Sequence, residues 1–259
     1  MGRIITLPED PYGENVEYET RRGIKKKVKL SSSTTYKMYQ KSRITIEPGV
    51  TVLVGCNGAG KSTLLSTIRS QLKKKEIPCL FFDHLTESDG RAKDEALYSG
   101  DFSYLAQSLS SSEGENIVLS LNRLSEKIVF FIKNGNMPKT SYNRIAEAFS
   151  NTVFKNEEKE KKQVSPINER WILLDACDSG LSIDNVLDIK KHLFQPLLAA
   201  ENYDVYIIVA ANEFEMVNGE KCISLPSCEK KNFRNYEKYK EEILNSRKMK
   251  EERYRNTEE

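Results

Sequence analysis

The sequence has little of what marks membrane, disulfide-bonded or strongly basic proteins. No apolar run approaches about 18 residues and the N-terminus is polar, so we expect neither a transmembrane helix nor a signal peptide. The five cysteines are scattered without a C-x-x-C pair, which argues against a disulfide framework or a zinc site and indicates a reducing cytoplasm. The net charge is only +2, so no global field attracts nucleic acid, although local basic patches stay open. We therefore expect a soluble cytoplasmic protein.

The most specific pattern that the chain does contain is glycine-rich. Residues 55–62, GCNGAGKS, fit the phosphate-binding pattern G-x-x-x-x-G-K-[ST]. The β-branched residues 50–54 before this loop predict a buried strand, and apolar residues at helical spacing predict a helix after it. Such a junction aims backbone N–H groups and the positive end of a helix dipole at a phosphate chain. The predicted nucleotide-binding residues of this segment are Asn57, Gly58, Ala59, Gly60, Lys61, Ser62 and Thr63.

The loop also predicts a magnesium site. Lys61 is expected to reach the β- and γ-phosphates, and the Ser62 hydroxyl is expected to bind Mg²⁺. The magnesium shell also needs an acidic residue that ends a buried strand. The apolar run at 171–174 is followed by Asp175, which makes this carboxylate the second predicted protein ligand of the ion.

These segments resemble those of an ATP-binding-cassette (ABC) ATPase. GCNGAGKSTLL at 55–65 follows the family's phosphate loop almost letter for letter. LLDACDSGLS at 173–182 resembles its LLDEPTSGLD segment, which carries the magnesium Asp, the catalytic Glu and a dimer-contact loop. Between them, SSEGE at 111–115 resembles the family signature LSGGQ, or its LSGGE form in chromosome-maintenance and DNA-repair heads. This register puts Ser112 and Gly114 on the signature Ser and second Gly, and Glu115 on its last position.

The resemblance implies a particular way of using ATP. Ser112, Gly114 and Glu115 would meet the γ-phosphate bound by the opposite subunit, at the N-terminus of an apolar helix whose free N–H groups and dipole favour an anion. Two ATP molecules with Mg²⁺ are then sandwiched between the heads of a homodimer, and hydrolysis or release resets the dimer. The resemblance also implies that the ATP-bound dimer acts on a separate protein partner. Nucleic acid stays open as a further partner, with the basic residues within 21–29 as a candidate contact.

Two positions depart from the family in ways that bear on catalysis. Ala176 stands where the family has the Glu that orients the attacking water, and a methyl group cannot accept a proton, so hydrolysis should be slow or absent. Either the chain is a natural ATP-binding switch, or the alanine was introduced to trap the ATP-bound state; the intact Asp175 and phosphate loop favour the second. Asn212 stands where the family has a His that contacts the γ-phosphate. Its amide could bond a phosphate oxygen, or the residue could cap the next turn. Asp178 does not occupy the family position of the base.

The remaining site assignments depend on weaker patterns. Asp83 or His84, at the end of a predicted strand over 79–83, could replace the glutamine that binds Mg²⁺ in this family, and Gln107 lies too close to the signature. Tyr36 or Tyr39 could stack on the adenine, although packing in the core is equally consistent with these residues. We take Asp83 as a third candidate magnesium ligand and Tyr36 as the candidate adenine contact.

The order of elements predicts the fold class. We expect an α/β P-loop NTPase with a mostly parallel sheet, flanking helices and a helical signature subdomain. The predicted strands are 50–54, 79–83, 171–175 and 205–210. We expect one domain over 1–259, with the signature subdomain over 90–165 and an amphipathic helix over 229–259, whose apolar stripe is Tyr236, Tyr239, Ile243 and Leu244. Sustained heptads are absent, so the long coiled-coil arms of chromosome-maintenance heads are not expected.

Three roles compete at this point. An ATPase of nucleic-acid maintenance, recombination or phage defence is favoured by Glu115 at the end of the signature and by the missing His. The nucleotide-binding subunit of a transporter ranks second. It would require a clear glutamine loop, a His at position 212 and a shorter segment between Ser112 and Asp175. A non-hydrolysing regulatory module follows if Ala176 is taken at face value.

Overall fold

The computed structural model describes residues 2–8, 14–19, 25–30, 37–83, 125–136, 167–178, 181–199 and 202–258; for 14–19, 25–30 and 254–258 it describes the backbone alone. Of the predicted signature subdomain over 90–165, residues 125–136 are described, and residues 125–134 form a helix. The predicted residues that lie outside the described ranges are Tyr36, His84, Gln107, Ser112, Gly114 and Glu115.

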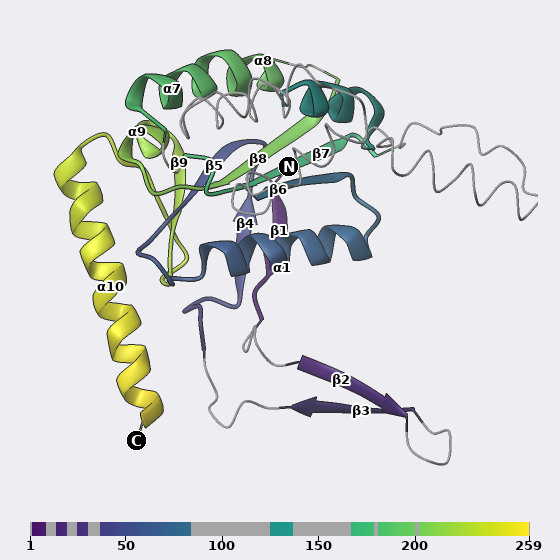
Figure 1. Ribbon diagram of the computed structural model, residues 1–259, viewed down its shortest axis with the longest axis vertical. Coiled ribbons are helices and arrows are strands. Elements are labelled where there is room, and N and C mark those ends of the chain that lie inside the picture. The colour runs from purple at the N-terminus through teal and green to yellow at the C-terminus, as the bar shows by residue number, and fades with distance from the viewer. Residues whose placement is uncertain are drawn as a thin grey trace, which may run out of the picture.

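A six-stranded sheet forms the centre of the described molecule, with the strand order β10–β9–β5–β8–β7–β6 (Figure 1). The parallel strands are β5 (Gly49–Val54), β6 (Cys79–Asp83), β7 (Glu169–Asp175), β8 (Asp204–Ala210) and β9 (Lys221–Ser224). The edge strand β10 (Glu229–Lys231) pairs antiparallel with β9. All four predicted strands lie in this sheet, which confirms the mostly parallel α/β architecture.

Two antiparallel pairs stand outside this sheet. β4 (Arg43–Ile46) pairs with β1 (Arg3–Thr6), and β2 (Glu14–Glu19) pairs with β3 (Lys25–Leu30). The Arg3 guanidinium attaches the first pair to the main sheet, because its Nε donates to the Glu169 carboxylate at the start of β7 over 2.7 Å.

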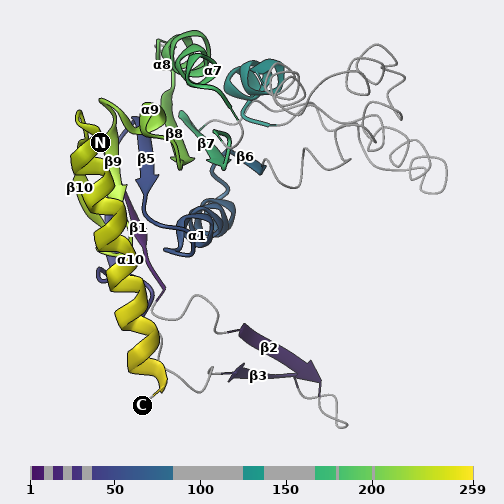
Figure 2. The ribbon, with the colours of Figure 1, turned by 60° about the vertical axis from the view of Figure 1, so that its left-hand side comes forward.

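Helices cover both faces of the sheet (Figures 1 and 2). The helix predicted after the phosphate loop is α1 (Lys61–Lys74), and its apolar residues at helical spacing, Leu64, Leu65, Ile68 and Leu72, are buried. The opposite face carries the helix of residues 125–134, α9 (Phe214–Val217) and a longer helical run. This run consists of α7 (Ile183–Asp188), a π-helical segment η2 (Ile189–Phe194) and α8 (Gln195–Leu198).

The central strands supply two separate cores, because successive side chains of a strand point to opposite faces. Leu173 of β7 packs in the core that contains Leu64 of α1, whereas Leu174 packs in the core that contains Phe131 of the helix 125–134. The rings of Trp171 and Tyr206 stack on the α1 side with centroids 4.1 Å apart. Burial on both faces explains why these strands are almost continuously apolar in sequence.

The C-terminal helix α10 (Tyr236–Glu258) is shorter than the helix predicted over 229–259, because residues 229–231 pair with β9 as β10. It lies along the edge of the molecule beside β9 and β10 (Figures 1 and 2). Of the predicted apolar stripe, Tyr239 and Ile243 pack against the core. Tyr236 is half-exposed and packs edge-on against Phe214 with ring centroids 5.6 Å apart, whereas the prediction is wrong for Leu244, which is 49% exposed.

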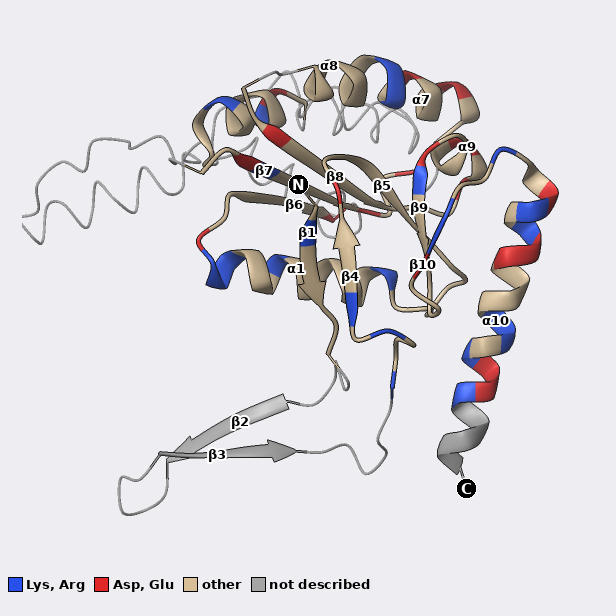
Figure 3. Cartoon of the chain, turned by 180° about the vertical axis from the view of Figure 1, so that it is seen from behind, with Lys and Arg blue, Asp and Glu red and all other residues tan. Residues whose placement is uncertain are grey.

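Short groups of basic and acidic residues alternate along the described part of α10 (Figure 3). Among the described helices of the molecule, none is both long and apolar enough to span a membrane.

Candidate nucleotide-binding site

A cavity of about 240 Å³ lies where the loops after β5, β7 and β8 meet. These strands are parallel neighbours, so their carboxyl ends deliver the following residues to the same edge of the sheet, where ligands of α/β proteins usually bind. The sheet therefore brings together the predicted phosphate loop, Asp175, Ala176 and Asn212. The residues that line the cavity are Cys56, Asn57, Gly58, Gly60, Lys61, Ser62, Thr63, Asp175, Ala176, Ala210 and Asn212.

The phosphate loop has a backbone that depends on glycine. Gly60, which precedes α1, has φ of 103°, and a Cβ at this position would lie 2.7 Å from the Met38 sulfur. Behind the loop, the Tyr39 hydroxyl donates a hydrogen bond to the Gly60 carbonyl over 2.9 Å, and Tyr39 is only 1% exposed. Tyr39 thus supports the loop from the core, and this burial removes it as an adenine-stacking candidate.

Lys61 and Ser62 begin α1 and point to different partners. The Lys61 ammonium donates to the Gly55 carbonyl over 2.6 Å. Burial lowers the pKa of Lys61, while the nearby Cys56, Asp178 and Asp175 oppose this shift. The Ser62 hydroxyl is hydrogen-bonded to the Asp175 carboxylate at the end of β7. The loop and the strand therefore meet through the two side chains that the sequence predicted as magnesium ligands.

The surroundings of Asp175 fit a divalent cation. Burial raises the pKa of Asp175, the hydrogen bond from Ser62 lowers it, and the charge of Asp83, its register partner on β6, raises it. An added cation would relieve this unfavourable burial of negative charge.

The donor chemistry points to magnesium rather than to a closed protein cage. Mg²⁺ takes oxygen ligands and commonly uses one or two carboxylates together with phosphate oxygens of the substrate. Within the described ranges no group of three or more His, Cys, Asp or Glu could hold a metal by itself. Ser62 and Asp175 fit Mg²⁺ that arrives with a nucleotide. Asp83 does not line the cavity, so its role as a ligand stays a prediction.

The position expected for the catalytic Glu exposes only a methyl group to the cavity. Ala176 lies directly after β7 with φ of 51°, in the left-handed region, and its N–H donates to the Ala210 carbonyl over 3.2 Å. No atom of its side chain can accept a proton.

Asn212 is held by its backbone from two directions. Its N–H donates to Asp178 Oδ2 over 2.7 Å, and its carbonyl accepts from the Tyr239 hydroxyl of α10 over 2.6 Å. The same Asp178 oxygen accepts from the Glu213 N–H over 2.7 Å. Asn212 lines the cavity, which agrees with its predicted place, whereas Asp178 is 0% exposed and does not line it. Asp178 thus positions the loop after β8.

Two residues of α10 also contact the phosphate loop and were not predicted from the sequence. Ser246 Oγ accepts from the Cys56 N–H over 3.1 Å, and the Lys250 ammonium donates to the Asn57 carbonyl over 2.9 Å. Apolar periodicity could not reveal them, because both contacts are made by polar side chains.

Residues 39–169, just over half of the chain, match the family model described as ABC transporter. The chain belongs to the ABC transporter family. Among solved structures, the ADP conformation of an ATP-binding cassette of an ABC transporter matches this ABC protein with 14% identity and a TM-score of 0.42, over 95% of this chain and 98% of that chain. No curated protein matches it.

Membership of the family confirms the predicted P-loop fold and an ATP-binding function. ABC ATPases typically bind ATP together with Mg²⁺ and generally hydrolyse it. The narrower resemblance to chromosome-maintenance heads stays a prediction.

Proposed function

We propose that this ABC protein is an ATP-dependent dimerising switch whose hydrolysis is suppressed by Ala176. One observation carries the proposal: the Ser62–Asp175 pair and the phosphate loop are in place around a cavity to which position 176 offers only a methyl group. The residues that would bind ATP are thus present, whereas the carboxylate that would promote its hydrolysis is absent. A chain built in this way would hold ATP in the cassette and keep it.

The residues of this chain would share the work of binding. The loop residues from Asn57 to Thr63 offer backbone N–H groups to the phosphates, and Lys61 would exchange its Gly55 contact for a phosphate oxygen. Ser62 and Asp175 would hold Mg²⁺, which, when bound, neutralises charge on the β- and γ-phosphates. Asn212 would hydrogen-bond the terminal phosphate. Ser112, Gly114 and Glu115 would close the site from the second subunit, since ABC domains commonly dimerise.

Suppressed hydrolysis follows from the absence of a general base. A positioned base contributes about 10²–10⁴-fold to the rate of such a step. Asp178 is a poor substitute, because it is fully buried behind the cavity wall and its Oδ2 already accepts two backbone N–H groups.

The test restores the carboxylate. The chain and its Ala176→Glu variant are compared for ATP turnover, and for mass by light scattering with and without ATP and Mg²⁺. Ala176→Gln is the matched control, because it has the size of Glu but cannot accept a proton. We expect ATP to produce a stable dimer of the original chain and of the Gln variant. The Glu variant should turn over at least about 100-fold faster and return to monomer.

Two other results would contradict this proposal, the first by rejecting the switch and the second by rejecting Ala176 as the cause of suppressed hydrolysis. If none of the three forms hydrolyses ATP or changes mass, the chain is a passive nucleotide-binding module and the trans role of Ser112 is wrong. If ATP is retained and the dimer forms but the Glu variant is equally inert, the chain is a non-hydrolysing regulator.

We further propose that the switch acts in the cytoplasm on a separate partner in nucleic-acid maintenance, recombination or phage defence. The glutamate that ends the signature-like segment and the Asn at position 212 support this assignment. DNA should then stimulate turnover by the Ala176→Glu variant.

A second candidate is the nucleotide-binding subunit of a transporter. The description of the matching family, ABC transporter, favours it. Co-purification of the chain with a membrane protein, together with turnover that DNA does not change, would support this alternative.

A further inference from the structure

The C-terminal helix α10 contacts two of the three loops that form the candidate ATP site, although α10 lies outside residues 39–169, which match the family model. Near its beginning, the Tyr239 hydroxyl bonds the Asn212 carbonyl after β8. Further along, Ser246 and Lys250 bond the phosphate loop at Cys56 and Asn57. One helix thus contacts the loop after β8 and the loop after β5.

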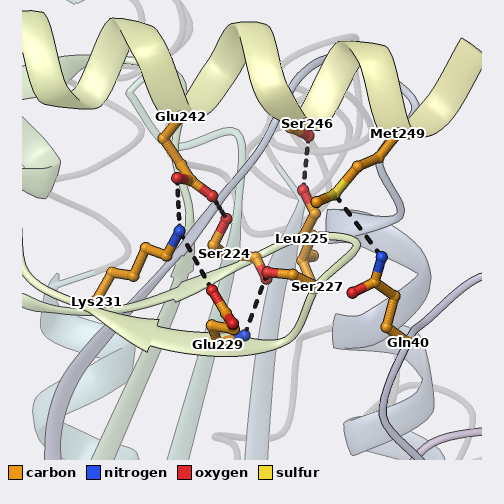
Figure 4. Close-up of polar contacts among 9 residues, drawn as sticks. All are labelled: Gln40, Ser224, Leu225, Ser227, Glu229, Lys231, Glu242, Ser246 and Met249. Atoms are coloured by element: carbon orange, nitrogen blue, oxygen red, sulfur yellow. Dashed lines mark hydrogen bonds and ion pairs between the residues drawn. The ribbon is translucent and has the colours of Figure 1, made fainter.

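A polar stripe holds α10 in this place. Tyr239, Glu242, Ser246, Met249 and Arg253 follow one another at intervals of three or four residues, which puts them on one helix face. Figure 4 shows the middle of this face: Glu242 bonds Ser224 and Lys231, Ser246 donates to the Leu225 carbonyl, and Met249 contacts Gln40. At the end of the stripe, Arg253 donates to the Met38 carbonyl over 2.9 Å. Contacts before and after Lys250 therefore fix its position on the helix.

The Lys250 ammonium rests directly on the glycine of the loop tip. Its Nζ donates to the Asn57 carbonyl over 2.9 Å, and a Cβ added to Gly58 would lie 2.8 Å from the same Nζ. Gly58 has φ of 77°, which also favours glycine. Both Asn57 and Gly58 line the cavity. The absence of a side chain at Gly58 is what lets the lysine approach the loop so closely.

The charges of the cavity lining leave a role for a further cation. Among the described residues that line it, Lys61 and Asp175 carry the formal charges, and these cancel. ATP with Mg²⁺ retains a net negative charge, which the cancelling charges of Lys61 and Asp175 do not balance. A second ammonium at the edge of the cavity would therefore act where positive charge is scarce.

We propose that Lys250 is a further nucleotide-binding residue, presented by α10 at Asn57–Gly58 to interact with the phosphates of ATP. This inference rests on the proposed ATP site. Because ATP carries one more phosphate group than ADP, the charge of Lys250 favours ATP over ADP. The same contact links the nucleotide to α10, and through Tyr239 to Asn212.

The test removes the charge and keeps the length of the side chain. Lys250→Met is compared with Lys250→Arg, which keeps a positive charge, and with Lys248→Met, which removes an exposed lysine two residues away. Dissociation constants for ATP–Mg²⁺ and ADP–Mg²⁺ are measured by isothermal titration calorimetry at two salt concentrations. Urea unfolding of each variant without nucleotide reports on its stability.

We expect Lys250→Met to weaken ATP binding about tenfold, as for the loss of one charged hydrogen bond, and to weaken ADP binding less. Its ATP affinity should also depend less on salt than that of the original chain. Lys250→Arg and Lys248→Met should bind ATP nearly as the original chain does.

Two results would overturn this inference alone. One is unchanged ATP affinity in Lys250→Met; the other is an equal loss for ATP and ADP that accompanies lower unfolding stability, which would make Lys250 a structural clamp of the loop. If the original chain binds no ATP, or binds it as well after Lys61→Ala, the proposed ATP site itself fails and this inference fails with it.

Discussion

Asp178 illustrates how one buried carboxylate can organise a site without facing its ligand. It lies three residues after Asp175, yet its Oδ2 accepts the N–H groups of Asn212 and Glu213 at the end of the neighbouring strand. Burial raises the pKa of Asp178, and these two hydrogen bonds lower it. The residue therefore joins the loops after β7 and β8, and the position of Asn212 depends on it.

At Asp178 we predict that replacement by Ala is costly and replacement by Asn is mild. Ala leaves two partly buried N–H groups without an acceptor, which should lower the free energy of unfolding by about 1–3 kcal/mol. Asn keeps one oxygen that can accept both bonds. Urea unfolding of the two variants at pH 7 checks the order.

The pH dependence of the Asn variant gives a second, independent readout. Because the folded-state pKa of Asp178 is raised, the folded chain binds more protons at this site than the unfolded chain does, so its contribution is fully present below about pH 4 and is lost as pH rises through the folded pKa. The stability difference should move in favour of Asp178→Asn between pH 4 and pH 7. If the stability difference between the original chain and Asp178→Asn does not change with pH, the folded-state pKa of Asp178 is not raised.

Among the elements, α10 is held against the domain mainly by polar contacts rather than by an apolar face. Ser246 is the clearest case, because it is 1% exposed, donates to the Leu225 carbonyl over 2.6 Å and accepts from the Cys56 N–H. The apolar packing of this helix is concentrated at its beginning, where Tyr239 contacts the rings of Phe214 and Phe233.

We predict that Ser246→Ala lowers the free energy of unfolding by about 1–3 kcal/mol, since two backbone groups lose their partner, with a gain in helix propensity offsetting up to about 0.5 kcal/mol. The matched control is Asn245→Ala, at the adjacent exposed position, which should change stability by less than about 0.5 kcal/mol. Urea unfolding measures both. Equal effects of the two substitutions would mean that this contact does not hold α10.

For the whole molecule, the candidate site is a junction of segments that are distant in sequence. The phosphate loop, the ends of β7 and β8, and α10 all meet at one edge of the sheet. A nucleotide that binds there contacts several of these segments in the folded state and none of them together in the unfolded state, so binding must stabilise the fold as a unit.

We predict that ATP with Mg²⁺ at 100 times its dissociation constant stabilises the chain by about 2.7 kcal/mol and raises Tm by about 5–10 °C. Lys61→Ala should remove most of this shift while leaving the Tm without nucleotide nearly unchanged. Differential scanning fluorimetry measures both. A Tm of the original chain that does not respond to ATP would contradict the assignment of the cavity.

The sequence alone determined the parts of this protein whose chemistry is local. Residues 55–62 form the phosphate loop because three closely spaced glycines, a lysine and a serine satisfy its backbone and phosphate requirements within eight positions. The parallel strands were predictable because burial on both faces demands continuous apolar runs. The place of Asp175 in the cavity lining was predictable because the residue ends such a run; its role as a magnesium ligand stays a prediction.

Only the tertiary structure decided how the site is supported. Tyr39 could stack on a base or pack in the core, and its burial against Gly60 resolved this choice. Lys250 is 193 residues from Asn57 in the chain, and nothing near either residue indicates that they meet. The docking face of α10 was predicted only in part, because periodicity detects buried apolar surface such as Tyr239, whereas the rest of this helix is held mainly by hydrogen bonds and ion pairs with residues of other elements. Such contacts depend on where the sheet edge places their partners, and local patterns contain no record of that placement.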